Sequence, residues 1–170
     1  MLNAFQDGNR TQFTPYSPDA LIAAAQRREA FDRDRHRVYS ISFWMTGNEL
    51  AAEDLMTDAF RSAFLNSASP SLEEVDQALV GALRATFDLP LFTLNCAAST
   101  KVRNVRRNTL RVELENAVLQ LPPTEKLIFL MHDVERYEHG RIARLLGITE
   151  RESHLGLHQA RLRLREILPS

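Results

Sequence analysis

The chain has 170 residues, of which 44% are hydrophobic and 25% are charged, a composition typical of a soluble globular protein of one or two domains. This excludes the collagen-like, disordered and disulfide-scaffold classes. The formal net charge of -1 does not point to nucleic acid, but residues 1–85 carry 8 basic and 12 acidic side chains, whereas residues 86–170 carry 13 and 10. This difference in charge between the two halves of the chain indicates two domains with different binding partners.

Cysteine usage and hydropathy indicate the compartment. Cys96 is the single cysteine, so no intrachain disulfide can form and a reducing environment is expected. A buried, inert thiol is favoured over a reactive one. No stretch approaches the roughly 20 apolar residues that a membrane span needs. The sequence therefore predicts a cytoplasmic protein with no membrane partner.

The front half is predicted to hold three helices after a flexible tail of residues 1–16. Ser17 and Pro18 are residue types that begin a helix. Ser71 and Glu74 have the spacing of a capping box. Apolar residues at helical spacing place the three helices at residues 18–45, 49–65 and 72–87.

Helical periodicity resumes after residues 89–105, to which we assign neither helix nor strand. Gly147 is predicted to end a short helix, and Thr149 with Glu152 has the spacing of a second capping box. The pattern predicts helices over residues 106–121, from Thr124, over 139–146 and from Thr149. Strand-like alternation is missing from the sequence, which therefore predicts an all-α fold of two small helical domains.

The segment Ile142–Thr149 carries the strongest local signal. Ala143 is small where two helices would cross, Gly147 accepts a tight turn that a Cβ would resist, and Ile148 fills the corner between the helices. These features favour a helix-turn-helix, whose second helix lies in the major groove of DNA. A plain helical hairpin with the same turn is the alternative.

Two sets of motifs occur here in the order in which a known family has them. In the back half they are Leu121-Pro122, the turn around Gly147, and the closing Ala160–Arg165; in the front half they are His36–Ser40, Thr46–Asn48 and Ala52–Phe60. On these motifs the chain resembles bacterial sigma-70 factors, most closely the small extracytoplasmic-function (ECF) group. The resemblance implies a core-polymerase-binding region 2-like domain over residues 17–98, a basic linker and helix start over 99–112, and a region 4-like helix-turn-helix domain over 113–170.

The resemblance also implies a polymerase-binding helix face made by Asp54, Thr57, Asp58 and Arg61. The family usually has glutamine where Thr57 stands. Because Asp54 and Asp58 are four residues apart, both acids share one exposed helix face. From the spacing alone, a solvated acidic surface explains this face equally well.

The sequence departs from the family where promoter DNA is melted at the −10 element. Strand separation needs aromatic platforms for unstacked bases and cations for phosphates. Residues 71–100 hold no tryptophan, and Arg84 is their single basic residue. A cluster of cations follows, either to hold a phosphate backbone or simply as solvated charges: Lys101, Arg103, Arg106, Arg107 and Arg111. We therefore predict divergent −10 reading, with Arg106 and Arg107 as DNA contacts.

The expected recognition helix departs from the family as well. Leu155 and Gly156 replace residue types that reach base edges. What remains is one basic stripe made by Arg151, His154, His158, Arg161 and Arg165, with Gln159 as the base reader. Alternatively, Leu155, Gly156 and Leu162 form a small apolar patch for a protein partner or a second copy of the chain.

The sequence contains little that indicates a catalytic site or a metal site. His154 and His158 have metal-ligand spacing, but no third ligand accompanies them, so we predict no metal, no cofactor and no enzymatic activity. The prediction is an ECF-type sigma factor that binds core RNA polymerase and promoter DNA, with an anti-sigma protein or a homodimer as further candidate partnerships. The alternative is a sigma-like regulatory protein that has lost promoter melting and acts through protein partners or dimerisation.

Overall fold

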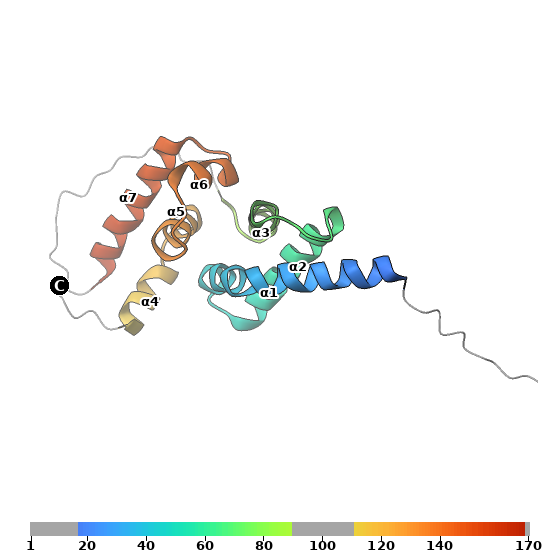
Figure 1. The fold of residues 1–170 in the computed structure, drawn as a ribbon. Coiled ribbons are helices and arrows are strands. Elements are labelled where there is room, and N and C mark those ends of the chain that lie inside the picture. Colours follow the sequence, from blue (N-terminus) through green and yellow to red (C-terminus); the bar gives the residue numbers. More distant parts are fainter. Residues whose placement is uncertain (1–16, 90–110, 169–170) are drawn as a thin grey trace, which may run out of the picture.

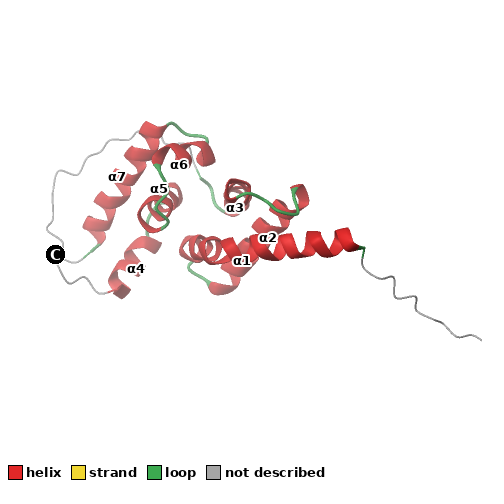
Figure 2. Ribbon diagram, in the orientation of Figure 1, coloured by secondary structure: helices red, strands yellow, loops and turns green. Residues whose placement is uncertain are grey.

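The computed structural model describes residues 17–89 and 111–168, and every regular element within these ranges is helical (Figure 2). The predicted all-α fold is confirmed. In chain order the elements are α1 (Pro18–Thr46), α2 (Glu49–Asn66), α3 (Leu72–Thr86), α4 (Arg111–Leu119), α5 (Pro123–Phe129), the π-helix η1 (Leu130–Val134), α6 (His139–Leu146) and α7 (Glu150–Ile167).

Helices α1, α2 and α3 form the front domain (Figure 1). α2 packs extensively against both α1 and α3. Apolar residues three or four apart give each helix one inward stripe, which contributes Val38, Ile41, Leu55, Phe60 and Leu79 to the core. The first turns of α1 extend beyond this bundle (Figure 1).

Helices α4 to α7 form the back domain (Figure 1). α7 packs mainly on α5 and α6. The core between them contains Leu127 and Met131 from α5 and η1, Ile142 from α6, and Leu157 from α7. The short helices α5 and α6 are thus held by tertiary packing rather than by their own length.

Two predicted capping boxes are confirmed, whereas Ser17 precedes α1 without a side-chain capping hydrogen bond. The Ser71 hydroxyl accepts a hydrogen bond from the Glu74 N–H at 3.2 Å, and the Glu74 carboxylate accepts one from the Ser71 N–H at 2.6 Å. Thr149 and Glu152 form the same reciprocal pair, at 3.2 and 2.7 Å. Each box satisfies two backbone donors that a helix start leaves unpaired.

Two helices differ from the predicted ranges. α4 ends at Leu119 instead of residue 121, and the predicted start at residues 106–110 lies outside the described part of the chain. The helix predicted from Thr124 begins at Pro123 and ends in η1, where the Glu135 N–H bonds to the Leu130 carbonyl at 3.0 Å. This bond spans five residues, so the last turn is one residue wider than an α-helical turn.

The two domains are in contact. Their buried apolar residues form one continuous core, in which α1 packs on α4, α5 and η1, and α3 packs on α6. Among the helices of residues 17–89 and 111–168, none combines the length and the apolar character of a membrane span. The predictions for residues 1–16, for Cys96 and for the cations between Lys101 and Arg107 lie outside the described residues.

Candidate nucleic-acid interface

The helix-turn-helix predicted from the sequence is present in α6, its turn and α7. Gly147 has φ 63°, the left-handed conformation that glycine tolerates best, and both its N–H and that of Ile148 bond to the Ala143 carbonyl. Ile142 is fully buried, at 0% exposure, and Ala143 is also buried. Thr149 then caps α7, so the turn and the second helix are built as the spacing predicted.

The basic stripe of α7 lies on its surface. Its members, spaced three or four residues apart, are all exposed: Arg151, His154, His158, Arg161 and Arg165. Gln159 is half-buried at the edge of this stripe. Of the alternative apolar patch, Gly156 is buried, whereas Leu155 and Leu162 are half-buried and keep part of their surface exposed. Its residues belong largely to the packed side of the helix.

A bidentate ion pair joins the stripe to the π-helix η1. Arg161 donates from Nε and Nη2 to the two carboxylate oxygens of Asp133, at 3.0 and 2.6 Å, and His132 Nδ1 lies 2.9 Å from the same carboxylate. Burial raises the pKa of Asp133, but the hydrogen bonds from Arg161 and His132 outweigh it and hold this pKa below its usual value. The arginine is therefore oriented by η1 before any ligand arrives.

Three imidazole rings from η1, α6 and α7 pack against one another: His132, His139 and His154. The ring centroid of His139 lies 3.6 Å from that of His154 and 4.4 Å from that of His132. His139 is 9% exposed, and its Nδ1 lies 2.9 Å from the Ser153 hydroxyl. Burial lowers the pKa of His139, and the neighbouring His154 and His132 lower it further. The contact between His139 and Ser153 joins α6 to α7.

The stacked rings do not form a metal site. Among residues 17–89 and 111–168, no group of three histidine, cysteine, aspartate or glutamate side chains is arranged to hold a metal ion. The stripe instead forms a basic helix face, of which His154 packs on His139 and Arg161 pairs with Asp133. Such a face is suited to a phosphate backbone.

Comparison with known families decides what this back domain is. Residues 111–164 match the family model for sigma-70, region 4. This region 4 domain is about a third of the chain, and no region 2 model is detected. A search of curated proteins finds no match.

Within the region 4 domain, the sequence did not predict the contacts of Asp133 and His139. Asp133 and Arg161 are 28 positions apart, and His139 and Ser153 are 14 apart. No local motif joins them, because the pairs form only when α7 packs on η1 and α6. The predicted DNA contacts Arg106 and Arg107 lie outside the described residues.

The predicted polymerase face lies on α2 in the front domain. Asp54, Thr57, Asp58 and Arg61 are all exposed, while Leu55, Ala59 and Phe60 on the other side of the helix are buried. Arg61 and Asp58 form an exposed ion pair at 2.7 Å, which contributes little to stability. The four side chains therefore share a surface that is open to a partner.

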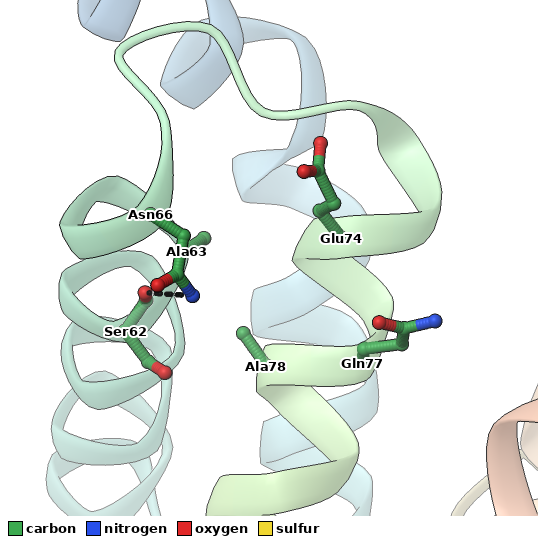
Figure 3. Close-up of a pocket in the computed structure, with 6 residues that line it drawn as sticks. All are labelled: Ser62, Ala63, Asn66, Glu74, Gln77 and Ala78. Carbon is green, nitrogen blue, oxygen red and sulfur yellow. Dashed lines mark hydrogen bonds between the residues drawn. The ribbon is translucent and has the colours of Figure 1, made fainter.

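A polar pocket of about 440 Å³ lies between the end of α2 and the start of α3 (Figure 3). Its lining has neither an aromatic ring nor a cation and consists of Ser62, Ala63, Asn66, Glu74, Gln77 and Ala78. The Glu74 carboxylate is engaged in the helix cap, and its negative charge opposes a nucleotide. The pocket lacks the stacking platform that a flipped base would need.

Proposed function

We propose that the chain is an ECF-type sigma factor of the sigma-70 family, whose α7 binds the −35 element of promoters and whose α2 binds core RNA polymerase. The observation that carries this proposal is the helix-turn-helix with an exposed basic stripe inside a region 4 domain. Gly147 caps the end of α6 and Thr149 caps the start of α7, and these caps set the angle between the two helices. The basic side chains of the stripe lie on one face of α7, which would enter the major groove.

The DNA-binding part of the proposal assigns two roles to α7. The five stripe residues hold phosphates and set the register of the helix on the duplex, while Gln159 reads a base edge. Arg106 and Arg107 would extend the phosphate contacts from the linker. Because leucine and glycine stand where the family places base-reading side chains, we expect affinity with little sequence discrimination.

The polymerase-binding part rests on the exposed α2 face. Two carboxylates four residues apart form an acidic surface, which suits a basic groove of a partner and speeds its association. We further propose the domain division of residues 17–98, 99–112 and 113–170, and a cytoplasmic location.

A second candidate function is supported by the front domain. A regulator that keeps the sigma fold but no longer melts promoters would need neither aromatic platforms nor free cations beside α3. The pocket at α2 and α3 has none, and Arg84 is hydrogen-bonded to the back domain. Such a protein would act through polymerase, an anti-sigma partner or self-association.

An in vitro transcription assay with core polymerase and the gene's own upstream DNA separates the two functions. Specific initiation supports the sigma factor, whereas polymerase binding without initiation supports the regulator. Reversing the acidic face in Asp54→Lys/Asp58→Lys should abolish co-purification with core polymerase while helicity persists.

The matched control for this reversal is Glu29→Lys/Asp32→Lys, which reverses two exposed acids on α1. It should leave co-purification unchanged. If both double variants behave alike, or if the α2 reversal still co-purifies, the assignment of the polymerase face fails.

A further inference from the structure

Two of the five side chains in the basic stripe of α7 are histidines. His154 and His158 are four residues apart, so they lie on the same helix face, and both are exposed. Histidine is the side chain whose charge ordinarily changes between about pH 5 and pH 8, whereas arginine is charged throughout this range. The positive charge of the stripe therefore depends on pH at two of its five positions.

A carboxylate already offsets part of the permanent charge of the stripe. Asp133 of η1 accepts two hydrogen bonds from Arg161, at 3.0 and 2.6 Å, and lies 2.9 Å from His132 Nδ1. Burial raises the pKa of Asp133, but the hydrogen bonds from Arg161 and His132 outweigh it, so this carboxylate is charged wherever histidine titrates. Outside this pair, the permanent cations of the stripe are the exposed Arg151 and Arg165.

The ring that stacks on His154 stays neutral when its neighbours become charged. The ring centroids of His139 and His154 are 3.6 Å apart, a distance at which two imidazolium ions would repel each other strongly. His139 is 9% exposed, and burial lowers its pKa, as do the neighbouring His154 and His132. As the pH falls, a proton therefore goes to the exposed ring of His154 before it goes to the buried ring of His139.

The other charged groups around the stripe change little over this pH range. Glu138 and Glu150 favour the charged form of His139, but burial and the two neighbouring histidines have the larger effect. The elements that pack on α6 and α7 carry charged groups with partners of their own, namely Glu125 with Arg163, Lys126 with the Leu119 carbonyl, Arg111 with Glu115, Arg141 with Asp76, Arg144 with Glu73, and Glu152 with Thr149. The charge of this helix face is thus changed by its histidines.

We propose that DNA binding by α7 takes up protons at His154 and His158, so that a fall in pH strengthens it. This regulation rests on the proposed DNA-binding function of the same helix face. A protonated imidazole donates from both ring nitrogens and so binds a phosphate oxygen, while the phosphate in turn favours the charged form of the ring. The stack on neutral His139 holds the ring of His154 in place during this change.

The size of the effect follows from the release of counterions. A phosphate contact that is worth nothing at 1 M salt is worth about fourfold in affinity at about 200 mM. Histidine is already partly charged at pH 7.5, so the gain between about pH 7.5 and pH 5.5 is about threefold for each ring and about tenfold for both. A tenfold gain over two pH units corresponds to the uptake of about half a proton on binding.

The test measures the affinity of the full chain for a short labelled DNA duplex by fluorescence anisotropy at about 200 mM salt. The pH is lowered from about 7.5 to about 5.5, over the values at which far-UV circular dichroism shows unchanged helicity. The variants are His154→Gln, His158→Gln and the double variant, which place a neutral polar side chain at exposed positions. The matched control is His36→Gln, which removes an exposed histidine from α1.

The parent and His36→Gln should gain about tenfold in affinity, each single variant about threefold, and the double variant little. Calorimetry in buffers of different ionisation enthalpy should show proton uptake by the parent and less by the double variant. An equal pH dependence in the parent and the double variant, or a flat response in His36→Gln, would overturn the proposal. If the chain binds no duplex at any pH, the proposed function fails. If it binds with an affinity independent of pH, only the proton-linked regulation fails.

Discussion

Replacing Arg161 by alanine tests whether the basic stripe of α7 contacts DNA. A guanidinium has five N–H donors, and Asp133 takes one from Nε and one from Nη2. The side chain is 49% exposed, so its remaining donors are able to reach a phosphate without breaking the pair. We therefore expect Arg161→Ala to remove one phosphate contact and to reduce stability by no more than about 1 kcal/mol.

The magnitude follows from counterion release. Each phosphate contact contributes about 0.9 to the slope of log affinity against log salt. If the contact is worth nothing at 1 M salt, its loss weakens binding about 15-fold at 50 mM salt and about fourfold at 200 mM. The loss should be nearly equal across duplexes of different sequence, because phosphates carry no base identity.

The assay is fluorescence anisotropy with several short duplexes across this salt range. Arg163→Ala is the matched control: it removes the same charge from the same helix, but Arg163 pairs with Glu125 at 2.7 Å on another side of α7. Should both variants lose affinity by the same factor, or should Arg161→Ala leave the salt slope unchanged, the stripe is not the DNA contact.

Two further predictions concern stability. Ile142→Ala removes a fully buried side chain of the helix-turn-helix and should lower the free energy of unfolding, measured by urea denaturation, by about 2–5 kcal/mol. The control Val134→Ala, at an exposed position, should change this free energy little. Equal losses in the two variants would contradict the packing described. The pKa of His139 is lower in the folded chain than its usual value of 6.5. As the pH falls, the His139 imidazole is therefore protonated in the unfolded chain before it is protonated in the folded chain. The stability of the folded chain should then fall as the pH drops through about 6.5. In thermal melts from pH 7.5 to 5.5, His139→Gln should flatten this fall, and an unchanged slope would refute the assignment.

Local features of the fold were predictable from the sequence because neighbouring residues determine them. Ser71 with Glu74, and Thr149 with Glu152, form the capping boxes that their spacing indicated. Gly147 takes the left-handed conformation expected of it. Such signals depend on residues three or four positions apart, so they survive in a single sequence without knowledge of the fold.

Long-range polar contacts were not predictable in this way. Asp76 sits one residue beyond Val75 in the apolar stripe of α3, at a spacing that points inward, but its partner Arg141 is 65 positions away. An acid in an inward position signals that a buried partner exists, yet not which one. The DNA and polymerase roles of the stripe and of the α2 face remain predictions, since exposure alone does not identify a ligand.

The hydrogen bond from Arg84 to Leu146 bears on how the region 4 domain can be transplanted. The donor lies 62 positions before the acceptor and outside the matched residues 111–164. A graft of those residues onto another front domain would leave this carbonyl of α6 to water. We therefore expect faster hydrogen exchange at the amides of the turn in the chimera than in the parent, because α6 loses the hydrogen bond that α3 supplies to its last turn.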